Sequence, residues 1–318
     1  MSAVETASVS VVEQLSALKK QLGQVIRGKD DVIEHLIVAL VAGEAVLIED
    51  VPGVGKTTLA KALARLVDLS FGRVQCTPDL LPADIFGFSV LNPQDGTFAF
   101  RRGPIFNNIL LVDEINRASP RTQSALLEAM AEKQVTIEGN QHSLPAPFLV
   151  LATQNPSGHA GTFSLPESQL DRFLFRLSMD YPDAVSEVEL LFDQAETHPL
   201  ENITAAISHD DLLECQSFTR AVRVEKCVAE YMVNIVRATR TDERVSLGCS
   251  PRGTLMLFRA AQARATVKGR DYVMPDDVQS IAPIVLGHRL VLQDARTVGR
   301  EEAEQLVRDI MTQVDVPR

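Results

Sequence analysis

Hydrophobic residues in the first 44 positions recur at the spacing of amphipathic helices. Apolar residues fall three or four positions apart from Leu15 to Leu22, and apolar positions return from Val32 to Val41. The stretch Val25–Gly28, which ends in glycine, interrupts this pattern. We therefore predict helical segments on either side of a short break.

From residue 45 to about 180, short apolar runs alternate with helical patterns. The runs Val46–Ile48, Ile109–Val112 and Phe148–Ala152 are typical of buried parallel strands, and helical patterns follow the first two. Such alternation places helices on both faces of a parallel sheet. The pattern therefore predicts an α/β fold with a parallel sheet covered on both sides.

Two segments within this half do not fit the alternation. Residues 73–107 are rich in Pro, Gly and Phe and include an Asp-Gly turn signal, so we predict an inserted hairpin near 89–101 rather than another strand–helix unit. A second hairpin is expected near 134–147. After residue 182 the strand signal fades and helical periodicity continues to the end. We expect a core domain over 1–182 and a smaller helical domain over 183–318.

The stretch between the first strand and its helix has the composition of a phosphate-binding loop. It matches G-x-x-x-x-G-K-[ST] except that Asp50 stands at the first glycine. Glycines let backbone N–H groups surround phosphate oxygens, Lys56 adds a cation, and the Thr57 hydroxyl is suited to Mg²⁺. The predicted nucleotide-binding residues of the loop are Pro52, Gly53, Val54, Gly55, Lys56, Thr57 and Thr58.

Polar residues follow the next two predicted strands. Asp113 and Glu114 end the second strand, where one carboxylate can hold Mg²⁺ and the next can polarise an attacking water. Asn155 follows the third strand and could orient that water. Each signal is weak alone, but their order behind a phosphate loop makes the combination specific. We therefore predict an ATP site with Mg²⁺ on Thr57 and Asp113.

Two arginines extend this prediction. Arg172 follows a helical stretch and is expected either to form a surface salt bridge or to act as an arginine finger on a neighbouring subunit's γ-phosphate. Ser250 and Pro251 indicate the start of a helix. Arg252 then lies in the first turn, where the helix dipole disfavours a cation. A nearby phosphate would offset that cost, as would full solvation of the guanidinium.

Composition limits the partners. Thirty-one basic and 42 acidic residues give a net charge of −11, which disfavours a main role in binding nucleic acid. No apolar run is long enough to span a membrane and no leader pattern begins the chain, so we expect a cytoplasmic protein. The four cysteines are scattered, which favours buried thiols over a zinc site or disulfides.

Taken in order, these motifs resemble the AAA+ ATPases and, within them, the MoxR family. The resemblance runs from about residue 22 to 292. Its specific stretches are Val51–Thr57, Asp79–Ile85, Gly103–Phe106, Val112–Arg117, Ser124–Met130, Ala152–Pro156, Leu165–Glu167, Leu170–Phe173, Ser250–Gly253 and Gly269–Val273.

The resemblance implies an αβα core with a helical lid, and roles at matching positions. Lys56 and Thr57 would belong to Walker A, Asp113 and Glu114 to Walker B, Asn155 to sensor 1, Arg172 to the arginine finger and Arg252 to sensor 2. The residues implied to line the adenine pocket are Val25, Ile26 and Gly28. The hairpins near 89–101 and 134–147 would be the helix-2 insert and the pre-sensor hairpin.

The family also implies assembly and partners. Relatives form hexameric rings with nucleotide between subunits, and they are thought to remodel proteins beside a partner with a von Willebrand factor A domain. Two positions depart from the pattern. Asp50 would add negative charge near phosphate, and Gly287 replaces a basic residue often found before His-Arg, which puts a lid contact there in doubt.

Four functions remain in view. The leading one is a ring-forming ATPase that remodels or loads a partner protein. A nucleic-acid motor or loader is disfavoured by the net charge. A magnesium-chelatase ATPase subunit shares the sheet-and-lid plan, although the motifs fit MoxR better. A purely structural nucleotide-binding module leaves Asp113, Glu114 and the two arginines without a role.

Overall fold

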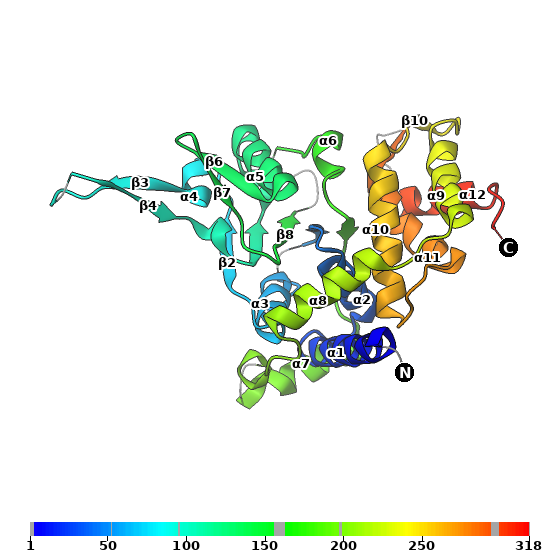
Figure 1. Ribbon diagram of the computed structural model, residues 1–318, viewed down its shortest axis with the longest axis horizontal. Coiled ribbons are helices and arrows are strands. Elements are labelled where there is room, and N and C mark those ends of the chain that lie inside the picture. Colours follow the sequence, from blue (N-terminus) through cyan, green and yellow to red (C-terminus); the bar gives the residue numbers. More distant parts are fainter. Residues whose placement is uncertain are drawn as a thin grey trace.

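Five parallel strands form the central sheet of the protein (Figure 1). The computed structural model describes residues 3–51, 53–94, 96–155, 163–196, 199–293 and 299–317. The strand order is β2-β5-β8-β1-β9, and every neighbouring pair is parallel. The bounds are β1 Val46–Glu49, β2 Phe71–Gln75, β5 Ile109–Asp113, β8 Leu149–Gln154 and β9 Phe175–Leu177. The predicted parallel sheet is confirmed.

Helices cover both faces of this sheet, because successive strand residues point to opposite sides. Val46 and Ile48 pack with α1, α2 and α3, whereas Leu47 packs with α5 and its neighbours. The helices of the core are α1 Ala3–Val25, α2 Asp30–Ala42, α3 Lys56–Leu66, α4 Pro82–Phe86, α5 Pro120–Glu132 and α6 Glu167–Leu170. The three-layer αβα arrangement is confirmed, as is the break between the first two helices.

Two strands of the sheet, β2 and β9, were not predicted from the hydrophobic pattern. β2 begins before residue 73, so the expectation that 73–107 adds no strand to the sheet is wrong for residues 73–75. As an edge strand, β2 buries only alternate residues, Gly72 and Val74, and it therefore lacks a continuous apolar run. β9 is three residues long and gives no periodic signal of its own.

Both predicted hairpins are present. β3 (Gly87–Leu91) pairs with β4 (Phe98–Arg102), and β6 (Gln134–Ile137) pairs with β7 (Asn140–Ser143). Figure 1 shows the β3–β4 hairpin projecting away from the rest of the molecule. At its base Gly87 has φ +98° and a Cβ there would lie 2.1 Å from the carbonyl oxygen of Arg101, so only glycine fits this crossing.

The remainder of the described chain is mainly helical. Figure 1 shows α9 to α12 grouped on the side opposite the hairpin, while α7 lies near α1 at the lower edge. A short antiparallel pair, β10 with β11, joins the lid elements and was not predicted. The bounds are α7 Ala184–Glu196, α8 His209–Ala221, α9 Lys226–Thr239, α10 Pro251–Val267, α11 Pro275–Leu286, α12 Arg300–Met311, β10 Val245–Leu247 and β11 Val291–Leu292.

Candidate active site

The phosphate loop joins β1 to α3 at the carboxyl edge of the sheet. Gly53 and Gly55 adopt φ of +92° and +94°, a region that residues with a Cβ rarely enter. Gly55 is also the N-cap of α3, so the loop ends at a helix N-terminus, where free N–H groups favour anions. Val54, Thr57 and Thr58 are half-buried in this turn, and Pro52 lies outside the described residues.

Lys56 is buried at the first position of α3. Its Nζ donates to the backbone oxygen of Asp50 at 2.8 Å. Burial lowers the pKa of Lys56, and the nearby carboxylates of Asp50, Asp113 and Glu114 partly oppose that shift. The positive charge of Lys56 therefore interacts with both predicted Walker B acids and is placed at the start of α3, where a lysine can bind phosphate.

Asp50 makes contacts that the sequence did not suggest. Its Oδ2 accepts hydrogen bonds from the backbone N–H groups of Met179 at 2.6 Å and Asp180 at 2.7 Å, while Oδ1 accepts from Val51 N at 2.8 Å. The side chain of Ser178 adds a bond of 3.3 Å, and Asp50 is only 5% exposed. The carboxylate thus joins the phosphate loop to the segment that follows β9.

Asp113 ends β5 between two partners. Its Oδ1 accepts from the hydroxyl of Thr153 at 2.7 Å, and its Oδ2 accepts from Nη2 of Arg73 at 2.7 Å. The Thr153 oxygen also accepts from Glu114 N at 2.9 Å, so one side chain of β8 positions both acids. These bonds fix the carboxylate of Asp113 while leaving acceptor sites free for a metal or water.

Glu114 has a left-handed backbone, with φ 57° and ψ 49°. Such a conformation costs a residue with a Cβ and is characteristic of functional sites. Its Oε1 accepts from Asn155 Nδ2 at 3.0 Å, and its Oε2 accepts from Arg117 Nη1 at 2.9 Å and Gln75 Nε2 at 3.2 Å. The structure therefore brings the predicted Asn155 to Glu114.

The ionisation of Glu114 follows from these bonds. Burial alone would raise its pKa, but hydrogen bonds from Arg117 and Asn155, together with the charge of Arg117, hold the pKa below its usual value. Glu114 is thus ionised at neutral pH. Sequence reasoning missed Gln75 and Arg117, which bond Glu114, and Arg73, which bonds Asp113; only Arg117, three residues after Glu114, was close enough in the sequence to be a usable signal.

Val25, Ile26 and Gly28, the residues expected to line the adenine pocket, lie at the end of α1 and just after it. Val25 and Ile26 are buried at the end of α1, and the Ile26 side chain lies 3.9 Å from where a Cβ of Gly55 would be. Gly28 has φ +67° and packs against Ser186 of α7. The structure therefore places Ile26 next to the phosphate loop, with Val25 and Gly28 beside it in the sequence.

Arg172 and Arg252 lie elsewhere. Both line a cavity of about 660 Å³, hereafter the arginine cavity, which also contacts Glu44 and Ala45 just before β1 and Phe148 just before β8. Those residues mark the amino edge of the sheet, whereas Lys56 and Glu114 lie at its carboxyl edge. Within one chain, the structure brings the two arginines together but not to the phosphate loop.

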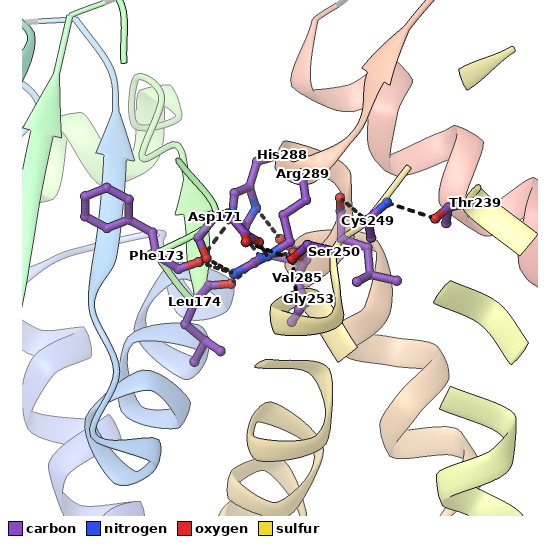
Figure 2. A network of polar contacts seen from close by, with 12 residues as sticks. Asp171, Phe173, Leu174, Thr239, Cys249, Ser250, Gly253, Val285, His288 and Arg289 are labelled. Carbon is purple, nitrogen blue, oxygen red and sulfur yellow. Dashed lines mark hydrogen bonds and ion pairs between the residues drawn. The ribbon is translucent and has the colours of Figure 1, made fainter. Parts of the chain in front are cut away.

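A buried polar network supports this pair (Figure 2). Asp171 accepts from Arg289 Nε at 2.9 Å and from the hydroxyl of Ser250, the N-cap of α10, at 2.8 Å. His288 Nε2 lies 3.2 Å from the backbone oxygen of Phe173. Burial, followed by the charge of Arg289, lowers the pKa of His288 well below its usual value, so the ring is neutral.

The network bears on the two predicted arginines and on the lid contact expected at Gly287. Asp171 precedes Arg172 and Ser250 lies two residues before Arg252, so the network joins the segments that carry both arginines. The lid contact that Gly287 put in doubt is made by His288 and Arg289 instead. Gly287 itself lies against α12, where a Cβ would be 3.2 Å from the backbone nitrogen of Glu304, leaving little room for a basic side chain.

Within the described ranges, no group of three or more His, Cys, Asp or Glu side chains could hold a metal, and no helix is long and apolar enough to cross a membrane. Cys76, Cys215 and Cys249 are buried free thiols, as predicted, whereas Cys227 is exposed.

The phosphate loop lies at the carboxyl edge of the five-stranded sheet, where Asp113 ends β5 and Glu114 follows it. This arrangement defines a nucleotide-binding protein of the phosphate-loop class. The family model described as "ATPase family associated with various cellular activities (AAA)" matches residues 45–175, and the model described as "AAA lid domain" matches residues 237–310.

Relatives that match over most of the chain show which AAA family it belongs to. The chain is 47% identical over 298 residues to YeaC of Bacillus subtilis, covering 94% of this chain and 93% of the relative. It is 39% identical over 307 residues to Chaperone MoxR1 of Mycobacterium tuberculosis, covering 94% and 81%. A crystal structure of a Cytophaga hutchinsonii protein superimposes with a TM-score of 0.91 at 35% identity, covering 99% of this chain and 98% of that one. The chain belongs to the MoxR family of AAA+ ATPases.

Proposed function

We propose that the protein hydrolyses ATP in a ring of identical subunits, with each active site completed by the neighbouring chain. The observation that carries this proposal is the separation of the site within one chain. Lys56 and Glu114 lie at the carboxyl edge of the sheet, and Arg172 and Arg252 line the arginine cavity at the other edge. A head-to-tail ring, expected to be a hexamer, would bring the two edges together.

The residues of one chain fit the binding half of this site. Backbone N–H groups of the phosphate loop and Lys56 would bind the phosphates, with Val25, Ile26 and Gly28 beside the adenine. Thr57 and Asp113 offer hydroxyl and carboxylate oxygens, the ligands that Mg²⁺ takes when phosphate and water complete its shell. Bound Mg²⁺ would neutralise charge on the phosphates.

The catalytic half combines groups from both chains. Glu114 would accept a proton from the attacking water, and Asn155, which donates to Glu114 at 3.0 Å, would help to orient that water. Arg172 and Arg252 of the neighbour would stabilise the charge that develops on the transferred phosphoryl group. The bonds from Arg117 and Gln75 hold Glu114 in position, and the bonds to Asp113 hold the metal ligand.

We further propose that ATP turnover remodels or loads a partner protein. One relative is named a chaperone, and the net charge of −11 disfavours a nucleic-acid substrate. The β3–β4 hairpin offers a contact surface, because Phe88, Leu91 and Phe98 are exposed along it. A protein with a von Willebrand factor A domain is the partner that the family resemblance suggests.

Two variants test this function. Glu114→Gln removes the base while preserving shape, and we expect ATP to remain bound in a stable oligomer with hydrolysis reduced at least about a hundredfold.

Arg172→Ala should abolish turnover with ATP affinity unchanged within about twofold, because Arg172 does not contact the chain's own nucleotide. Turnover is measured by phosphate release and affinity with a fluorescent ATP analogue. Parental turnover by either variant would refute the assigned role. Affinity capture with Glu114→Gln in ATP would then identify the partner.

A further inference from the structure

Helix α7 exposes a continuous apolar surface. Tyr181, Val185, Leu191 and Phe192 are between 70% and 76% exposed, and Val188 is 52% exposed. Residues 185, 188 and 192 recur three or four positions apart, so they lie along one side of the helix, and Tyr181 lies in the segment just before it. Five large apolar side chains that are exposed together mark an interaction surface rather than scattered surface residues.

This apolar surface lies beside the binding half of the active site. Ser186, on the buried side of α7, packs against Gly28, and Glu189 forms an ion pair with Arg27 at 3.9 Å. Lys29 donates from Nζ to the backbone oxygen of Tyr181 at 2.9 Å. The helix is therefore attached to the loop expected to bind adenine. Any chain that approaches this nucleotide to deliver an arginine passes close to α7.

The face around the arginine cavity has complementary chemistry. Besides Arg172 and Arg252, the arginine cavity is lined by three further basic residues and by exposed or half-buried apolar residues of α10. Its single acid, Glu44, is paired with Arg259. Helix α7, by contrast, has several acidic residues and neither Lys nor Arg in its sequence. The basic residues are Lys133, Arg220 and Arg259, and the apolar ones are Leu255 and Phe258.

We propose that the apolar side of α7 docks on the α8–α10 face of a second copy of this chain, next to that copy's arginine cavity. Apolar contacts of Val188, Leu191 and Phe192 with Leu255 would form the centre, and acidic side chains of α7 would meet Arg220 and Arg259 at the rim. The choice of occupant rests on the proposed function, since the neighbour that supplies Arg172 presents this face.

Cross-linking between separately prepared chains tests the contact directly. In a Cys227→Ser background, Leu191→Cys and Leu255→Cys chains are mixed with Mg²⁺ and a non-hydrolysable ATP analogue, then treated with a short bis-maleimide. A cross-linked dimer is expected from the mixture and not from either chain alone. Phe98→Cys, an equally exposed apolar position on the hairpin, replaces Leu191→Cys as the matched control and should give no dimer with Leu255→Cys. Absence of the 191–255 cross-link in assembled protein overturns the docking site.

A second test measures assembly by sedimentation. The combined change Val185→Ser, Val188→Ser and Phe192→Ser should raise the concentration needed for assembly at least about tenfold, because the apolar centre of the interface is lost. Binding of a fluorescent ATP analogue to the isolated chain should persist, which shows that the variant folds. Unchanged assembly overturns the inference. ATP turnover that requires Arg172 but tolerates these changes would refute the docking site alone, whereas turnover independent of Arg172 would refute the proposed function.

Discussion

Asp50 occupies the position at which the phosphate-loop motif has glycine, and its carboxylate accepts backbone hydrogen bonds from Met179 and Asp180. A glycine at this position could not make these bonds. Asp180 has a positive φ of 50°, so the chain turns sharply where Asp50 holds it. The departure from the motif is therefore a structural connection between the loop and the segment that leads to α7.

Asp50→Ala should destabilise the protein by about 2 kcal/mol, because it leaves buried N–H groups of Met179 and Asp180 without an acceptor. ATP affinity should fall as well, since the loop loses this support. Asp50→Asn retains one acceptor oxygen and should give a smaller loss of stability. Urea unfolding and binding of a fluorescent ATP analogue measure both effects. Equal stability of the parent and Asp50→Ala would refute this role.

At the residue scale, the sequence could predict which groups carry chemistry but not what holds them. Lys56 and Glu114 belong to local motifs whose spacing is visible along the chain. The contacts of Arg73 with Asp113 and of Gln75 with Glu114 depend on β2 lying in register with β5, where Gln75 pairs with Asp113. That register is a property of the assembled sheet, so no local pattern predicts it.

At the element scale, Glu34 joins three helices. Its carboxylate on α2 pairs with Lys19 of α1 and with Arg264 at 3.1 Å and Lys268 at 3.2 Å at the end of α10. Burial alone would raise the pKa of Glu34, but its bonds to Lys19 and Lys268 lower the pKa to about 2. Because the folded-state pKa lies below the unfolded value of 4.5, the carboxylate stabilises the fold above that pH and loses this effect as pH falls toward 2.

Glu34→Gln should therefore lower the free energy of unfolding by about 2 kcal/mol at neutral pH. The difference between parent and variant should shrink as the pH falls below about 4.5. Denaturant unfolding of both proteins over a series of pH values measures this difference. A constant difference across the acidic range would show that the ionised carboxylate is not the cause.

The network around Asp171 connects two further elements. It joins the segment between α6 and β9, which carries Arg172, to α10, which carries Arg252. Arg289 is buried and bonds both this carboxylate and the backbone, so its removal leaves a partly buried charge without its partner. The sequence showed the motifs of Arg172 and Arg252 separately. Their connection through His288 and Arg289 could not be predicted, because it depends on how the lid packs against the core.

Arg289→Met should cost about 3 kcal/mol of stability and slow ATP turnover, with ATP affinity nearly unchanged, because the arginine cavity loses its shape. Arg308→Met on α12 is the matched control, since Arg308 is exposed and pairs with Glu304 at 3.4 Å on the surface of the same helix. Thermal unfolding and steady-state turnover distinguish the two. A loss of turnover that is the same in both variants would contradict this prediction.

At the scale of the whole molecule, alternation of strands and helices predicted the parallel sheet through three of its five strands, turn signals predicted both hairpins, and helical periodicity predicted the helical C-terminal part. The position of the lid was not predictable, because it depends on buried contacts between α6, β9 and η4 (Gly287–Arg289). The proposed shared active site rests on this position. It places Arg252 beside Arg172 at the amino edge of the sheet, where neither reaches the Lys56 and Glu114 of its own chain.

The central claim is that each active site is shared by two chains, and mixing two inactive variants tests it most directly. Glu114→Gln lacks the base and Arg172→Ala lacks the arginine, so each alone should be inactive. In mixed rings, an Arg172→Ala chain supplies Glu114 and a neighbouring Glu114→Gln chain supplies Arg172, which restores some complete sites. Phosphate release by the mixture should then exceed the sum of the two separate preparations. A mixture that forms mixed rings yet stays as inactive as its components would contradict a site shared between chains.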